Sequence, residues 1–353
     1  MPTTQGHPIP GPGADPPPAE AETTTNNLEL CSHIPAMVSS LPSSHGLFSL
    51  PLYRHAQGWH ASHVSMVGAM AADACFAARP TDILVVTLPK SGTTWIKSLL
   101  FATVRRGEHP PAAAADHPLS SSGPHECVRS LENQVYAHDE APDLRGLPDP
   151  RLFATHVPYA ALPRSVAAAA AGCKVVYVCR DPKDTLVSFW HFQNRIRAAR
   201  GQEPLDVDAA AGFFCDGVSP FGPYWDHVLG YWRAHRDRPD RVLFLRYEQM
   251  WSDPAAHVRR LAEFAGLPFG GGDRDADEVD AVVRLCSFER LSGLEVNRAG
   301  KTRFVGGAAL DNSYFFRRGV VGDWVNHLPV ETARRIDAIT EAKFKGSGLL
   351  LTM

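Results

Sequence analysis

A loop with the composition of an anion site lies near residue 90. It reads Leu88-Pro89-Lys90-Ser91-Gly92-Thr93-Thr94-Trp95 and follows an apolar run over residues 83–88. A tight glycine turn into a helix presents free backbone N–H groups and the positive end of the helix dipole, and both favour phosphate. Lys90 adds a full charge, and Thr93 and Thr94 add hydroxyl donors. The loop therefore predicts a phosphate-binding site.

This loop differs from the nucleotide P-loop, G-x-x-x-x-G-K-[ST]. If Gly92 is the second glycine, Thr87 stands at the first and Thr93 stands at the lysine position. The lysine that reaches the terminal phosphates of ATP is therefore missing, and Lys90 lies earlier in the loop. Such a loop fits a nucleotide with a shorter 5′ chain better than it fits ATP with magnesium.

A second motif combines an arginine with a hydroxyl group. Arg180 follows the apolar run over residues 174–179, and Ser188 lies about two helical turns further along. An arginine fork and a hydroxyl can together hold a second phosphate. Asp181 resembles a carboxylate that holds magnesium. Because Pro182 follows it, we expect Asp181 to cap the next helix instead.

These motifs lie where predicted buried strands end. The predicted strands are 83–88, 174–179, 242–246 and a weaker one at 151–155; the predicted helices are 93–105, 181–197 and 247–264, the last with a break at Ser252-Asp253-Pro254. Strands that alternate with helices predict a single α/β domain with a central, mainly parallel sheet flanked by helices. Ligands of such domains bind beyond the carboxyl ends of the strands.

The composition limits the class of protein further. The chain has 353 residues, of which 44% are hydrophobic and 21% charged, as in a folded soluble protein. Lys and Arg total 35 and Asp and Glu total 38, so the net charge is −3. This balance argues against partners such as nucleic acid or an anionic membrane surface. No apolar run approaches the roughly 18 residues of a membrane span.

The remaining segments set the expected domain limits and location. We expect a disordered tail over residues 1–35, the domain over 36–348, a short tail over 349–353, and loops at 109–124 and 270–278. The seven cysteines are scattered and include no C-x-x-C pair, which disfavours a disulfide framework and a zinc site. The N-terminus lacks a cationic start and an apolar stretch, so we expect a cytoplasmic protein.

Taken together, the motifs resemble those of the plant cytosolic sulfotransferase family. The resemblance rests on Lys-Ser-Gly-Thr-Thr-Trp at 90–95, Arg-Asp-Pro-Lys-Asp at 180–184, Arg-Leu-Phe-Ala-Thr-His-Val-Pro at 151–158, and Arg-Arg-Gly with Gly-Asp-Trp at 317–324. It covers about residues 37 to 348. The family transfers a sulfonyl group from 3′-phosphoadenosine-5′-phosphosulfate (PAPS) to an acceptor, and the resemblance implies no metal.

The resemblance also implies a role for individual residues. The 5′-phosphosulfate would be bound by Lys90, Ser91, Gly92, Thr93 and Thr94, the 3′-phosphate by Arg180, Ser188, Arg317, Arg318 and Gly319, and the adenine by Trp95, Tyr247, Ser287 and Phe288. His156 matches the family's catalytic base, and Lys90 would stabilise the leaving phosphate. A bisphosphorylated nucleotide explains both predicted phosphate sites, whereas a nucleoside triphosphate explains only the first.

Several positions depart from the family pattern. Ala154 stands where animal relatives carry a second lysine, and Cys286 stands where a hydroxyl residue is common. Val325 replaces the lysine that usually follows Gly-Asp-Trp, and the segment after it does not fit the family's dimer motif. We therefore expect a monomer or a weak dimer.

The acceptor is predicted only as a class. We expect its pocket to be formed by the loops at 125–138, by Tyr159 and by residues 213–225, whose aromatic residues favour a small flat or apolar hydroxyl compound, either phenolic, flavonoid, steroid or jasmonate-like. Two alternatives stay open. One is a P-loop nucleotide kinase, and the other is a nucleotide-binding relative that catalyses nothing.

Overall fold

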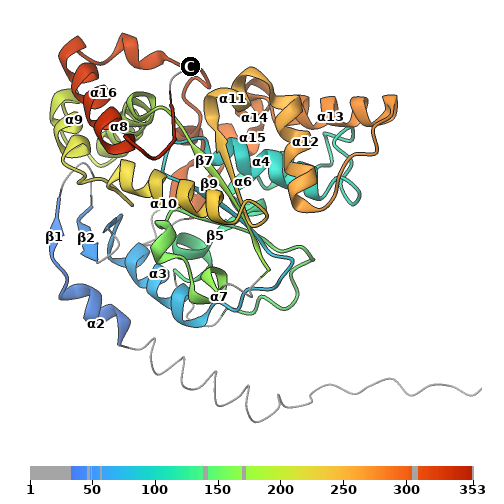
Figure 1. Cartoon of the computed structure of the whole chain (residues 1–353), viewed down its shortest axis with the longest axis horizontal. Coiled ribbons are helices and arrows are strands. Elements are labelled where there is room, and N and C mark those ends of the chain that lie inside the picture. Colours follow the sequence, from blue (N-terminus) through green and yellow to red (C-terminus); the bar gives the residue numbers. More distant parts are fainter. Residues whose placement is uncertain are drawn as a thin grey trace, which may run out of the picture.

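The centre of the molecule is a parallel sheet. The computed structural model describes residues 33–45, 48, 50–55, 58–137, 142–168, 172–303 and 309–351. In this part of the chain five strands form a sheet in the order β5-β6-β4-β7-β8, and every neighbouring pair is parallel. Their bounds are β4 Ile83–Thr87, β5 Arg129–Ser130, β6 Leu152–Thr155, β7 Lys174–Cys179 and β8 Val242–Arg246. The predicted α/β fold is confirmed (Figure 1).

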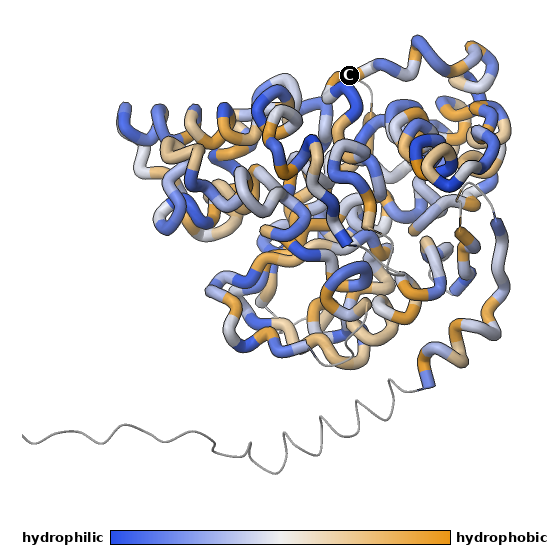
Figure 2. The backbone as a smooth tube through the Cα atoms, turned by 180° about the vertical axis from the view of Figure 1, so that it is seen from behind, coloured by the Kyte–Doolittle hydropathy of each residue, from blue (hydrophilic) through white to orange (hydrophobic). Residues whose placement is uncertain are grey.

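Helices surround this sheet. In chain order they are α2 Ile34–Ser39, α3 His63–Cys75, α4 Thr93–Val104, α5 Pro118–Ser121, α6 Pro124–Cys127, η1 Leu131–Val135, η2 Tyr159–Ala161, α7 Arg164–Ala167, α8 Pro182–Ala199, α9 Val207–Cys215, α10 Tyr224–Asp237, α11 Tyr247–Ser252, α12 Pro254–Ala265, α13 Asp273–Leu285, α14 Phe288–Gly293, α15 Glu295–Arg298, η4 Asn312–Phe315, η5 Asp323–Asn326 and α16 Val330–Phe344. No helix in the described ranges is long and apolar enough to span a membrane. Apolar and polar residues alternate along the outer helices (Figure 2).

Two small antiparallel sheets complete the structure. The first contains β1 Ser43–Ser44, β2 Leu52–His55 and β3 Gly58–His60, and the second contains β9 Lys301–Arg303 and β10 Ala309–Asp311. Neither sheet was predicted, because strands of two to four residues are too short to show a periodic pattern. The edge strand β5 was missed for the same reason.

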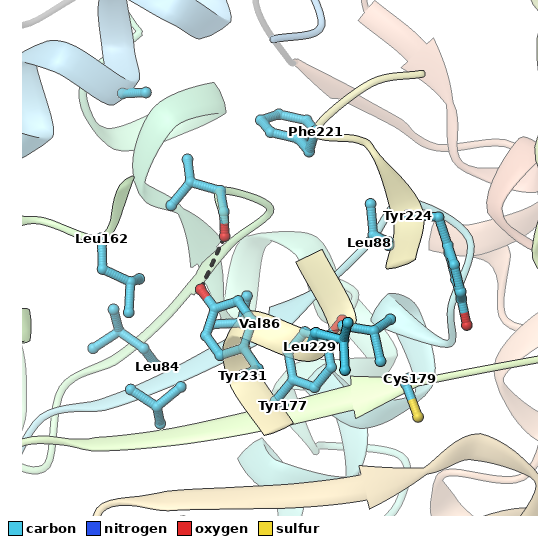
Figure 3. Close-up of a cluster of buried hydrophobic side chains, with 14 of the residues drawn as sticks. Leu84, Val86, Leu88, Leu162, Tyr177, Cys179, Phe221, Tyr224, Leu229 and Tyr231 are labelled. Carbon is cyan, nitrogen blue, oxygen red and sulfur yellow. Dashed lines mark hydrogen bonds between the residues drawn. The ribbon is translucent and has the colours of Figure 1, made fainter. Parts of the chain in front are cut away.

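Both faces of the central sheet are buried, which explains its continuous apolar strands. Leu84 and Val86 of β4 belong to one hydrophobic cluster, whereas Ile83 and Val85 belong to another on the opposite face. Tyr177 of β7 stacks on Tyr231 of α10 with ring centroids 4.3 Å apart in the first cluster. The Tyr231 hydroxyl donates a hydrogen bond to the main chain just beyond β6 (Figure 3). The core thus fixes the strand end that carries His156.

The helix breaks follow local chemistry. The predicted break before Pro254 is confirmed, since Asp253 lies between α11 and α12 and its carboxylate caps α12. The loop predicted at 270–278 is wrong beyond Gly272, because α13 begins at Asp273. Acidic residues in its first turn interact favourably with the helix dipole. Buried Val279, Val282 and Leu285 anchor one face of the helix. The glycine run alone remains non-helical.

The packed region reaches slightly beyond the limits expected from composition. In α2, Ile34 and Val38 are buried and join the main hydrophobic cluster, as does Leu349 near the other end. These apolar side chains anchor both ends of the packed region in the core, although the sequence around them is largely polar. Residues 1–32 of the expected N-terminal tail and residues 352–353 lie outside the described residues.

A buried ion pair joins the strands at the end of the sheet opposite the motifs. Arg151 donates to both carboxylate oxygens of Asp82, at 2.8 and 2.5 Å, and neither residue is more than 4% exposed. The carboxylate also accepts the backbone N–H of Arg79, and the guanidinium binds the carbonyl of Ala77. The pair links the starts of β4 and β6.

We predict that Asp82→Asn lowers the free energy of unfolding by about 3–5 kcal/mol, because it leaves the Arg151 charge buried without its partner. Chemical denaturation would measure the change. Asp143→Asn is the matched control, since its partner Arg145 is exposed, and it should leave the midpoint unchanged. Equal midpoints for both variants would contradict the structural role of the buried pair.

Candidate active site

The predicted site residues meet at one edge of the sheet. Moving across the sheet, β6 is followed by His156, β4 by the Lys90 loop, β7 by Arg180, and β8 by Tyr247. The strand ends are level because Thr87 pairs with Val178 and Cys179 pairs with Arg246. All four groups line a single cavity of about 440 Å³. The parallel register thus brings together motifs that lie far apart in the sequence.

The Lys90 loop has a backbone that requires glycine. Gly92 has a φ of 97° and caps α4 in the left-handed conformation. A Cβ atom on Gly92 would lie 2.7 Å from the Tyr247 ring. Thr93, Thr94 and Trp95 line the cavity beside Gly92. The free N-terminal amides of α4 therefore open onto the cavity, as an anion site requires.

Ser91 is placed differently from its neighbours. It is 1% exposed and does not belong to the described residues that line the cavity. Its hydroxyl lies 3.4 Å from that of Thr185, and its backbone N–H donates to Leu88. Ser91 thus links the loop to α8, and the structure does not bring its side chain together with the other predicted site residues.

The half-buried side chain of Lys90 places its ammonium group among aromatic rings and other cations. Its Nζ lies 4.4 Å from the Phe192 ring centroid and 3.4 Å from the carbonyl of Tyr314. Burial, followed by the nearby cations Arg180, Arg195 and Arg317, lowers the pKa of Lys90 to about 7. A bound anion would favour its charged form. The cavity therefore has the electrostatics of a site for a polyanion.

His156 is held in one tautomer. Its Nδ1 lies 2.7 Å from the carbonyl oxygen of Thr87, which can only accept, so Nδ1 carries the proton. Nε2 then keeps its lone pair, and the ring lines the cavity. Burial lowers the pKa of His156, although Glu132 and the Thr87 carbonyl oppose this shift. A neutral imidazole with a free nitrogen is the form that a general base needs.

Arg180 is buried and fixed by several partners. It is 6% exposed, pairs with Asp184 at 3.3 Å, and donates to the carbonyl of Val320. Its guanidinium also lies 4.5 Å from the Tyr247 ring centroid. Its Nε is buried without a hydrogen-bond partner in the described ranges. Ser188, which is 6% exposed, lines the same cavity. A fixed guanidinium beside a hydroxyl suits an anionic ligand.

Asp184 joins the arginine motif to the C-terminal glycine motif. Its buried carboxylate accepts the backbone N–H groups of Gly322 at 2.7 Å and Trp324 at 3.0 Å, besides the ion pair with Arg180. The sequence contains Asp184 within a recognised motif, but no sequence pattern indicated these partners. The nearby Asp181 caps α8, as predicted, by accepting from Lys183 and Asp184.

The C-terminal basic residues are oriented by one carboxylate. Arg317 and Arg318 both donate to Asp323, and their side chains are 14% and 57% exposed. Burial opposes the ionised form of Asp323, but hydrogen bonds from neighbouring side chains, including Arg317, lower its pKa to about 2. Gly319 has a φ of 67°, and a Cβ there would lie 2.5 Å from the Phe288 ring. All three predicted residues line the cavity.

Aromatic side chains form the wall between the two cationic regions. Trp95 meets Tyr247 edge to face with ring centroids 5.5 Å apart, and Phe288 is 38% exposed. Ser287 caps α14 through the Arg290 N–H and also lines the cavity. Cys286 lines it too but is fully buried, and burial raises the pKa of its thiol. A planar base would fit against such a wall.

Most of the remaining lining of the cavity is apolar. Of the regions expected to form the acceptor pocket, the residues that line the cavity are His125, Ser130, Asn133, Pro220 and Phe221. Tyr159 is not among its described lining residues, nor are Phe213 and Trp225; Tyr159 packs on Tyr231 instead. His138 lies outside the described residues. No group of three or more His, Cys, Asp or Glu placed to hold a metal occurs in the described ranges.

Other lining residues were missed by sequence reasoning. They include Phe48, Leu50, Lys97, Phe189, Phe192, Ile196, Leu310, Phe315 and Phe316. Phe189 and Phe192 follow Ser188 on the same helix, so helical spacing could have indicated them. Lys97 and Ile196 lie on the long helices α4 and α8, and the others come from loops and short elements, so their place in the lining depends on tertiary packing.

Fold and site together define an α/β protein in which an anion-binding loop, a second cationic region and a histidine line one cavity. The sulfotransferase domain family model matches residues 80–348, and the chain belongs to this family. It is 40% identical to cytosolic sulfotransferase 15 of Arabidopsis thaliana, over 89% of this chain and 85% of that protein. Cytosolic sulfotransferase 16 is 46% identical over 78% and 79% of the two chains. These names agree with the expected cytoplasmic location.

Solved structures agree with this assignment. A sulphotransferase of Arabidopsis thaliana shares 35% identity and a TM-score of 0.69, covering 90% of this chain and 94% of that one. Mouse sulfotransferase SULT7A1, solved in complex with PAP (3′-phosphoadenosine-5′-phosphate), shares 26% identity and a TM-score of 0.64, covering 84% and 95%. The protein is therefore an enzyme of the sulfotransferase class, and the kinase alternative is not supported.

We predict that Gly92→Ala lowers the free energy of unfolding by about 1–3 kcal/mol, because it adds a clash with Tyr247 to an unfavourable left-handed φ. Thermal and chemical denaturation would measure this loss. Gly107→Ala is the control, since no atom lies within 4 Å of the added Cβ. A Gly92→Ala protein as stable as the control would show that the loop tolerates another geometry.

Proposed function

We propose that the enzyme transfers the sulfonyl group of PAPS to the hydroxyl of a small organic acceptor, without a metal. The observation that carries this proposal is the single cavity that joins two cationic regions, an aromatic wall and a histidine. A nucleotide with a 5′-phosphosulfate and a 3′-phosphate matches both regions. The PAP complex of mouse SULT7A1 supports the proposal by analogy.

The nucleotide would be bound through its two phosphates and its base. The α4 N-terminus, Lys90, Thr93 and Thr94 would bind the 5′-phosphosulfate. The 3′-phosphate would be bound by Arg180, Ser188, Arg317, Arg318 and Gly319. The guanidinium of Arg180 supports this assignment, because it is held in place by Asp184 and the residue lines the cavity. The adenine would lie against Trp95, Tyr247, Ser287 and Phe288.

The transfer step needs a base and a stabilised leaving group. His156 Nε2 would take the proton of the acceptor hydroxyl as its oxygen attacks the sulfur. A new oxygen–sulfur bond forms while the bond from sulfur to the phosphate oxygen breaks in line. PAP then leaves with the negative charge, and Lys90 stabilises the charge that develops on the bridging oxygen. The products are the sulfated acceptor and PAP.

The acceptor would occupy the apolar end of the cavity. Phe221 packs 5.4 Å from the His156 ring centroid, and Phe48, Phe189 and Phe315 contribute further aromatic surface. A flat or apolar molecule with one hydroxyl fits this lining, whether it is phenolic, flavonoid, steroid or jasmonate-like. The hydroxyl would have to reach His156.

We predict that His156→Gln and Lys90→Ala each reduce kcat about 10²- to 10³-fold, as the loss of one transition-state contact does. Transfer from radiolabelled PAPS to a responsive hydroxyl compound would measure turnover. His33→Gln replaces an exposed histidine outside the cavity and should match the wild type. Turnover of either site variant within tenfold of the wild type would refute its assigned role.

We also predict that Arg180→Gln weakens binding of PAP at least tenfold but barely changes binding of AMP, because only PAP carries a 3′-phosphate. Calorimetric titration of both nucleotides would measure the two affinities. Arg195→Gln, which alters a cation outside the predicted 3′-phosphate set, is the control. Equal losses for PAP and AMP would contradict the proposed orientation of the nucleotide.

A further inference from the structure

Two buried charged residues, Glu132 and Lys97, act on the electrostatics of the proposed base. Glu132 in η1 is 1% exposed, and Lys97 on α4 is 2% exposed. Among the described residues the two side chains are bound by hydrogen bonds to other groups rather than to each other. Burying separated charges is costly in a folded protein. Their partners indicate what each one stabilises.

Glu132 holds the main chain of His156. Its Oε1 accepts the backbone N–H of His156 at 2.8 Å and the side-chain amide of Asn133 at 2.9 Å. Its Oε2 is buried and has no hydrogen-bond partner in the described part of the chain. On the other side, His227 Nε2 lies 3.0 Å from the His156 carbonyl oxygen. His156 is thus fixed at its N–H, its carbonyl and its ring.

Lys97 contacts a second histidine that lines the cavity. Its Nζ lies 3.4 Å from His125 Nδ1, and His125 Nε2 lies 3.2 Å from the Thr94 hydroxyl. An ammonium group can only donate, so His125 accepts at Nδ1 and carries its proton at Nε2. Burial lowers the pKa of Lys97 to about 8, while the charge of Glu132 opposes that shift. The charge of Glu132 therefore acts on Lys97 through electrostatics, without a hydrogen bond between the two side chains among the described residues.

We propose that Glu132 is a positioning residue for sulfonyl transfer, which fixes His156 and stabilises the imidazolium formed when Nε2 takes the acceptor proton, while Lys97 moderates that effect. This inference rests on the proposed role of His156. The charge of Glu132 raises the pKa of His156, and the charges of Lys97 and Lys90 lower it. The other titratable groups that face the ring are His125 from α6 and His227 from α10. Glu132 and Lys97 should therefore shift the pKa of His156 in opposite directions.

The test is the pH dependence of kcat/KM in two variants. Glu132→Gln keeps an acceptor for the His156 N–H but removes the charge, so the acid limb should move to lower pH by about one unit. Lys97→Met removes the opposing charge and should move the acid limb to higher pH. The KM for PAPS should stay unchanged in Glu132→Gln while kcat falls. Glu126→Gln, an exposed carboxylate on α6, is the matched control and should shift nothing.

Opposite shifts support the inference, and shifts that share a direction or are both absent overturn it. If Glu132→Gln does not fold, the Lys97→Met profile decides alone, since an unchanged acid limb would overturn the moderating charge. The His156→Gln assay distinguishes failure of the proposed base from failure of the role given to Glu132 and Lys97. Loss of turnover there with unshifted profiles in the other variants would refute the inference while leaving the base assignment intact.

Discussion

The buried carboxylate of Asp184 holds together the parts of the site that lie furthest apart in the chain. It pairs with Arg180 at the end of β7 and accepts two backbone N–H groups from the Gly322–Trp324 segment. Without it, a buried guanidinium would lack its counter-charge, and the C-terminal segment would lose its attachment to α8. The position of Arg317 and Arg318 depends on that same segment, because Asp323 orients both.

The electrostatics of the cavity follow from this arrangement. The chain as a whole carries a net charge of −3, yet cations converge where the parallel strands end. Their mutual repulsion, together with burial, lowers the pKa of Lys90. A polyanion would relieve that repulsion, so binding energy would come from charges that the fold has already desolvated. Burial, in contrast, lowers the pKa of His156 and so favours the neutral form that the proposed base requires.

Much of this could be predicted from the sequence. The strands at 174–179 and 242–246 were predicted to the residue, because strands buried on both faces form continuous apolar runs bounded by polar residues. The cap at Asp181 followed from local chemistry, since Pro182 comes next. The predicted site residues other than Ser91 line one cavity, in agreement with the rule for parallel sheets.

What could not be predicted depends on tertiary contacts. The helix at 273–285 was not predicted, because a run of glycines precedes it, although its first turn is acidic and one of its faces is apolar. The partners of Asp184, Glu132 and Lys97 come from distant elements, so no local pattern indicates them. The acceptor pocket was predicted only in part, because its walls come from loops that no periodicity constrains. Tyr159 and Trp225 were expected in those walls, yet both pack into the core side of the sheet.

The most direct test of the central claim is transfer by the wild-type enzyme. The purified protein would be incubated with labelled PAPS and a panel of small hydroxyl compounds, with and without EDTA, and the products would be identified by mass spectrometry. The account predicts a sulfated product and one equivalent of PAP, formed at the same rate with the chelator present. Tight PAP binding without transfer to any member of the panel would favour a catalytically silent relative, and failure to bind PAP at all would contradict the account.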